Sequence, residues 1–190
     1  MSRSLIAILL FAQASPQIGA GLERGMQMHY TTGGAVTPWE IVAVNRDTAA
    51  LAGARCVSVR LRFNPADTMV VHRIHCARGD TMFNWSAAAG QFVAARPLAA
   101  GTLITARADG GRVAYTSRGV EIDTVDGRPL LVVPTTVETF DRSGTLTQRL
   151  RERFAISLAT ATDGIFERPV NGVLQETQRF RLSRLVPGER

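Results

Sequence analysis

The stretch that decides the fold, VEIDTVDGRPLLVVPTTVETF, spans residues 120–140. Two segments rich in β-branched and apolar residues flank the dipeptide Asp126-Gly127. Asp-Gly tolerates the positive φ angles of a type I′ turn, whose twist matches that of paired strands. A two-residue loop there places Ile122 opposite Leu131, so apolar side chains meet on one side of the hairpin and mixed side chains on the other. The pattern predicts an antiparallel hairpin whose Ile122–Leu131 side is buried.

The same turn chemistry recurs along the chain, and β-branched segments lie between the turns. The turn signals are Gly33-Gly34, Asp109-Gly110-Gly111, Asp126-Gly127, Asp141-Arg142-Ser143-Gly144, Asp163-Gly164 and Asn171-Gly172. They predict an all-β fold: a single antiparallel, strongly curved sheet that forms a half-barrel or barrel, with a meander of hairpins in the C-terminal half. Closure into a barrel is the arrangement that best protects the strand edges.

One segment, TLTQRLRERFAISLATA at residues 145–161, fits two interpretations. Leu146, Leu150 and Phe154 lie four residues apart, as on one face of a helix. These three residues are also all even-numbered, as are Ile156 and Leu158. Residues two apart share one face of a strand, so the segment also fits a strand. Because turn signals lie on both sides, we expect a strand.

Both cysteines lie in CVSVRLRFNPADTMVVHRIHC, residues 56–76. The Asn-Pro-Ala-Asp sequence in its middle is a turn signal, and Cys56 and Cys76 are equidistant from Ala66. In a hairpin centred on Ala66, the two cysteines face each other on the same side of the sheet. We therefore expect a disulfide between Cys56 and Cys76.

That register has one weakness. It places Val57 and Val59 opposite His75 and Arg73, so apolar residues face polar ones. A shift of one residue would match the apolar side chains better, but would put the cysteines on opposite faces. A β-bulge would reconcile the two, and we keep it as an alternative for this hairpin.

The histidines beside the second cysteine raise the alternative of a metal site or of a cysteine nucleophile with a histidine base. In a strand, however, His72 and Cys76 share a face while His75 points to the other. Thiols of an exported protein also tend to pair. We therefore expect no metal site here.

The N-terminus has the three regions of a secretory signal peptide in order. Arg3 supplies the positive charge, residues 5–11 are apolar, and Ala12-Gln13-Ala14 fits the cleavage rule. The apolar run is far shorter than the roughly 20 residues of a membrane span. We expect residues 1–14 to be a signal peptide and residues 15–190 a single β domain, exported to the periplasm or the exterior.

All 22 basic residues are arginines, and the formal net charge is +6. Aromatic residues make up only 6% of the chain, too few for the stacking platforms of single-strand binders, so no nucleic-acid partner is expected. Arg149, Arg151 and Arg153 would line one side of a strand. They form either a cationic strip for an anionic partner or a solvated face paired with nearby glutamates, which we favour.

Common enzyme motifs are absent from the sequence. It has no Gly-x-Ser-x-Gly elbow and no Gly-x-Gly-x-x-Gly, and a phosphate-binding loop would need a lysine. We therefore expect no catalytic residues, no metal and no cofactor, and hence a protein that is not an enzyme.

Two stretches, RPLAAGTLITAR (96–107) and RERFAISLATATDGIFERP (151–169), carry a resemblance. Their shared features are a Pro-Leu-x-x-Gly step into a strand and a late glycine followed by an apolar pair. The residues are Pro97, Leu98, Gly101, Gly164, Ile165 and Phe166. Over its C-terminal half the chain resembles the periplasmic half-barrel proteins of the LolA and LppX type. The resemblance implies a lipid or another apolar molecule in the concave face of the sheet.

Two hypotheses for function follow. The first is an exported soluble protein that binds a lipid or other apolar ligand in the concave face of its sheet. The alternative is a cell-envelope interaction module with a filled core that acts through an arginine-rich face. A deep cavity lined by the inner strand faces would favour the first. The sequence leaves the ligand and the oligomeric state open.

Overall fold

The structure is a computed structural model that describes residues 17–46 and 50–188. The signal peptide expected at residues 1–14 lies outside this part of the chain. The described residues form thirteen strands: β1 (Gln27–Thr32), β2 (Ala35–Asn45), β3 (Arg55–Arg62), β4 (Val71–Arg78), β5 (Thr81–Ser86), β6 (Gln91–Pro97), β7 (Ala100–Ala106), β8 (Arg112–Arg118), β9 (Glu121–Val125), β10 (Arg128–Phe140), β11 (Leu146–Ala155), β12 (Thr160–Val170) and β13 (Val173–Val186).

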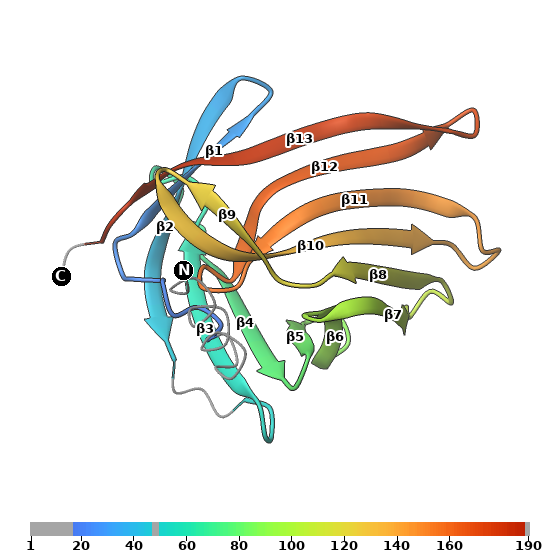
Figure 1. The fold of residues 1–190 in the computed structure, drawn as a ribbon, viewed down its shortest axis with the longest axis horizontal. Coiled ribbons are helices and arrows are strands. Elements are labelled where there is room, and N and C mark those ends of the chain that lie inside the picture. Colours follow the sequence, from blue (N-terminus) through green and yellow to red (C-terminus); the bar gives the residue numbers. More distant parts are fainter. Residues whose placement is uncertain (1–16, 47–49, 189–190) are drawn as a thin grey trace, which may run out of the picture.

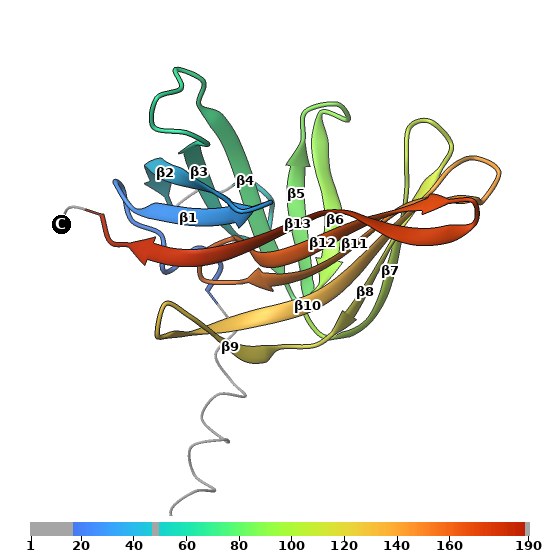
Figure 2. The same ribbon diagram turned by 90° about the horizontal axis from the view of Figure 1, so that it is seen from above.

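All of these strands belong to one antiparallel sheet, as predicted. Its order is β6-β5-β4-β3-β2-β1-β13-β12-β11-β10-β8-β7, and β9 pairs with β10. The two end strands, β6 and β7, are consecutive in the sequence and contact each other without forming a strand pair. The sheet therefore curls almost into a closed barrel with a single seam (Figure 1). Figure 2 shows the long, curved β10 to β13 from above.

The hairpin at Asp126-Gly127 has the predicted turn and register. Both residues have positive φ, 51° and 73°, and Ile122 pairs with Leu131. The prediction of its buried side was wrong, because Ile122 is 74% exposed. β9 pairs with β10 alone.

The segment at 145–161 is a strand up to Ala155, as predicted. The turn signal at Asp163-Gly164 was wrong, because both residues lie inside β12, and the turn falls at residues 156–159 instead. Gly164 serves packing rather than chain reversal. A Cβ built on it would lie 2.5 Å from the Phe180 ring, so only glycine leaves room for that ring on the neighbouring strand.

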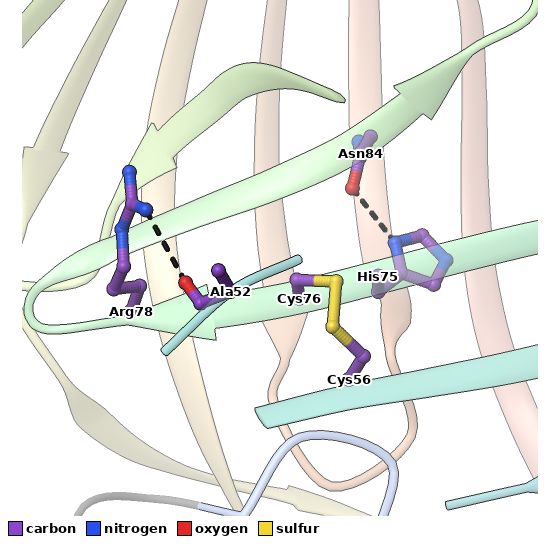
Figure 3. The surroundings of a disulfide bond; sticks show 6 residues. All are labelled: Ala52, Cys56, His75, Cys76, Arg78 and Asn84. Carbon is purple, nitrogen blue, oxygen red and sulfur yellow. Dashed lines mark hydrogen bonds between the residues drawn. A yellow bond between two sulfur atoms is a disulfide. The ribbon is translucent and has the colours of Figure 1, made fainter. Parts of the chain in front are cut away.

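The hairpin formed by β3 and β4 confirms the disulfide. Cys56 and Cys76 pair directly and their sulfurs are bonded, with an S–S distance of 2.08 Å (Figure 3). The register runs unbroken between these strands, so the bulge alternative was wrong. His75 therefore lies opposite Val57 on the other face of the hairpin from the disulfide, which is where the interior of the barrel lies.

One end of the barrel is filled by the N-terminal segment. Gly19 and Gly21 donate backbone hydrogen bonds to the turn after β11, and the buried Ile18 and Leu22 join the main hydrophobic cluster. A Cβ on Gly19 would lie 2.8 Å from Val57, so this segment packs closely against β3. Within the described ranges, no helix has the length and apolarity that a membrane span requires.

Candidate ligand-binding cavity

A cavity of about 440 Å³ lies inside the barrel. Its lining comes from β1, β2, β4, β5, β6, β11, β12 and β13, and from the turn before β12. Small-molecule sites in proteins typically have volumes of roughly 300–1,000 Å³.

Aromatic rings form one wall of the cavity. The ring centroids of Tyr30 and Trp39 are 4.3 Å apart, and Phe180 lies 6.1 Å from both Tyr30 and Phe166. The Tyr30 hydroxyl donates a hydrogen bond to the carbonyl of Ala161 at 2.7 Å, which fixes the ring. Burial raises the pKa of Tyr30, so the hydroxyl stays neutral. This wall offers an apolar surface on which the Tyr30 hydroxyl is already hydrogen-bonded.

A buried ion pair crosses the interior. Nη2 of Arg96, on β6, lies 2.8 Å from Oε1 of Glu152, on β11, and both side chains are more than nine-tenths buried. The guanidinium carbon of Arg96 also lies 3.9 Å from the centroid of the Phe154 ring. The Nε and Nη1 atoms of Arg96 are buried without a hydrogen-bond partner. Oε1 of Glu152 also lacks a hydrogen-bond partner, so the ion pair leaves hydrogen-bonding capacity of both residues unused.

A second arginine, Arg73 on β4, also lines the cavity. Its guanidinium carbon lies 5.5 Å from the centroid of the Phe63 ring. Burial lowers the pKa of Arg73, but an arginine remains charged at neutral pH. No ion pair among the described residues includes Arg73, so its charge is not neutralised by a carboxylate.

His75 lines the same cavity two residues further along β4. It hydrogen-bonds through Nδ1 to Oδ1 of Asn84 at 2.8 Å (Figure 3). Because a carbonyl oxygen only accepts, Nδ1 carries the proton in this arrangement. Burial, with a smaller effect of the positive charges of Arg73 and Arg96, lowers the pKa of His75 to about 4, although the hydrogen bond to Asn84 opposes the shift. The ring is therefore neutral at physiological pH.

The histidine and cysteine residues that raised the metal alternative do not come together. His72 lies on the outer face of the barrel, where Nε2 is 2.6 Å from Oγ of Ser58. His75 lies inside, and Cys76 is in the disulfide. In the part of the chain that the structure describes, no three His, Cys, Asp or Glu residues are grouped as metal ligands would be.

The predicted strip of Arg149, Arg151 and Arg153 lies on the outer side of β11, since the residues between them face the cavity. Each arginine is paired with a carboxylate. The pairs are Arg149–Glu138 at 2.7 Å, Arg151–Glu167 at 2.8 Å and Arg153–Asp123 at 3.0 Å. Much of the positive charge of the strip is thereby matched within the protein.

The comparisons with known proteins concern the fold alone. No family model and no curated protein sequence matches the chain. The fold is similar to that of a solved structure from Bacteroides fragilis NCTC 9343, described as "a putative exported protein with YmcC-like fold". The TM-score is 0.51 at 9% sequence identity, and the match covers 90% of this chain and 100% of that one.

Partial signals of the cavity are present in the sequence. Arg73 and His75 share one face of β4 and pair with Val59 and Val57. In the sequence, polar residues opposite apolar ones look like a sign of the wrong register. This pattern instead marks the point where the inner face changes from packed core to cavity lining. The partnership of Arg96 and Glu152 had no local signal, because 56 positions separate the two residues (152 − 96).

Proposed function

We propose that the protein is exported and binds a lipid or another apolar small molecule inside its barrel. Export is supported by the signal pattern at residues 1–14 and by the disulfide, since disulfides persist in oxidising compartments. Export is supported further by the similarity of the fold to that of the Bacteroides fragilis structure, which is described as "a putative exported protein".

The cavity is the observation that carries ligand binding. It combines a volume of about 440 Å³ with aromatic walls and a few buried polar groups, which is the usual composition of a small-molecule site. Exposed Gln178 is part of the lining and marks the mouth, whereas the N-terminal segment fills the other end of the barrel. A ligand would enter beside Gln178 and lie along the inner strand faces.

This proposal is of the kind that the resemblance to LolA and LppX implies, with an apolar molecule held by the concave face. We propose binding rather than catalysis, because the ionisable groups of the cavity are held by structural partners: Glu152 by Arg96, and His75 by Asn84. The arginine-rich face is the weaker candidate, since its three arginines are each paired with a carboxylate.

Native mass spectrometry of protein purified from the periplasm, followed by solvent extraction, tests the proposal. We expect a bound mass that disappears on extraction and that is identified as an apolar or amphipathic molecule. Protein that carries no such mass, and that takes up none when mixed with a total lipid extract, would contradict ligand binding. Salt-sensitive binding to acidic vesicles by that same protein would favour the envelope module instead.

A further inference from the structure

We propose that the ligand is a single-chain amphiphile with an anionic head group, a carboxylate or a phosphate, that Arg73 and Arg96 recognise. The inference rests on the proposed function and adds to it the chemical class of the ligand. It is carried by the charge of the cavity, by the unused donors of Arg96, and by the division of the lining into a cationic end and an apolar end.

The charged side chains of the described lining do not balance. Arg73 and Arg96 are positive, Glu152 is negative, and His75 is neutral, so the sum is +1 (two minus one). The unpaired cation, Arg73, is half-buried, and a charge that is partly removed from water without a partner is unfavourable. An anionic group in this cavity would supply the missing partner.

The hydrogen-bonding state of Arg96 points the same way. A guanidinium has five N–H donors, and Glu152 lies against Nη2 alone. Nε and Nη1 have neither a partner nor contact with solvent. Buried donors in native proteins are almost always satisfied, so an acceptor that Nε or Nη1 could reach after a small shift of the Arg96 side chain would complete its hydrogen bonds.

Both arginines line the cavity, and the charges of both act on His75. Arg73 and His75 are two apart on β4 and therefore point to the same side. His75 and the guanidinium of Arg96 both lie against the Phe154 ring, with the His75 and Phe154 ring centroids 6.3 Å apart. Both cations therefore act on the protonation of His75.

The other end of the lining is apolar and suits a hydrocarbon chain. Leu150, Phe166 and Phe180 meet there, and the Phe180 ring fills the space left by Gly164. A volume of about 440 Å³ is in the lower part of the range for small-molecule sites, which fits one alkyl chain rather than the two of a diacyl lipid.

Calorimetric titration of delipidated full-chain protein with three amphiphiles of one chain length tests the inference. The set is dodecanoate, dodecyl phosphate and dodecanol. We expect at least one of the anions to bind about tenfold or more tightly than the alcohol, as befits a charge-assisted hydrogen bond. Whichever anion binds more tightly identifies the source, carboxylate or phosphate.

The variant Arg73→Gln should lose about tenfold in affinity for the anion while its affinity for dodecanol stays unchanged. Arg73→Lys, which retains the charge, should keep the preference. Arg60→Gln is the matched control, because Arg60 is an exposed residue on the outer face of β3. If Arg73→Gln does not melt cooperatively, the comparison of the three amphiphiles on the wild type decides alone.

The two proposals fail in different ways. Equal affinity for dodecanol and both anions would leave cavity binding intact and overturn the anionic head group. An anion preference that Arg73→Gln fully retains would overturn the role of Arg73. Failure of all three amphiphiles to bind would overturn the proposed function together with this inference.

Discussion

Arg96 and Glu152 form an ion pair across the inside of the barrel, although β6 and β11 are not neighbours in the sheet. Through the seam, the three strands β7, β8 and β10 lie between β6 and β11. The pair therefore connects the last strand before the seam to the far wall. Since β6 and β7 share no strand pairing, this contact helps to hold the barrel closed.

Removing the charge of only one partner of this ion pair should lower the free energy of unfolding. In Glu152→Gln the Arg96 charge stays buried with its partner neutralised, and we expect about 3 kcal/mol less free energy of unfolding in urea. The double variant Arg96→Met/Glu152→Gln removes the charge as well and should recover much of that loss. The exposed pair Arg179–Glu176 is the control, and Glu176→Gln should change stability by less than about 0.5 kcal/mol. Equal effects for the buried and exposed pairs would contradict this account.

The disulfide should act as a structural link. It closes a loop with a sequence separation of 20, so the double variant Cys56→Ala/Cys76→Ala should lose roughly 3 kcal/mol of unfolding free energy by the loop-entropy estimate. Chemical unfolding with and without reductant measures the loss, and reduced wild type should match the variant. Two free thiols in the exported protein, detected by mass spectrometry, would refute the structural role.

His75 should make stability depend on pH. The pKa of His75 is about 4 in the folded state and has its ordinary value of 6.5 in the unfolded chain. As the pH falls, the unfolded chain therefore binds the proton first. The contribution of neutral His75 to the free energy of unfolding is complete above about pH 6.5 and is lost as the pH falls toward 4. The gap between the two pKa values corresponds to about 3 kcal/mol. Urea unfolding between pH 7 and 4 should show a steeper loss in wild type than in His75→Gln, and parallel curves would contradict the prediction.

Gly164 should be intolerant of a side chain because of its contact with Phe180. Gly164→Ala places a Cβ 2.5 Å from that ring, and we expect a loss of about 1–3 kcal/mol on thermal or urea unfolding. A second substitution, Phe180→Leu, should relieve part of the loss because it removes the ring. A double-mutant cycle measures this coupling, and additive effects of the two substitutions would show that the residues do not interact.

The local features of this fold could be predicted from the sequence. Asp126-Gly127 and the cysteine pair each specified a hairpin and its register through turn geometry, which depends on neighbouring residues only. The all-β sheet followed from repeated signals of this kind. Ile122 shows the limit, because whether its side of the hairpin is covered depends on strands elsewhere in the chain.

The cavity could not be predicted, because its lining comes from strands that are far apart in the sequence. Gly164 has the local signal of a turn, but its function is to make room for Phe180 on the next strand. From the sequence alone, Arg73 looks like a polar residue on an apolar strand face. In the barrel it lines a cavity together with residues of β6 and β11, which are distant in the sequence. Sequence patterns report which face a residue occupies, whereas the sheet's curvature decides whether that face is packed or hollow.

Blocking the mouth of the cavity tests the central claim most directly. Gln178→Trp places a large ring where the exposed Gln178 lines the cavity, and Gln175→Trp adds the same ring at an exposed position of β13 away from that lining. The measurement is the fluorescence of the apolar dye N-phenylnaphthylamine titrated into delipidated protein. We predict saturable binding to wild type and to Gln175→Trp, and about tenfold weaker binding to Gln178→Trp. Equal dye binding by all three folded proteins would place the dye outside the barrel and contradict the account.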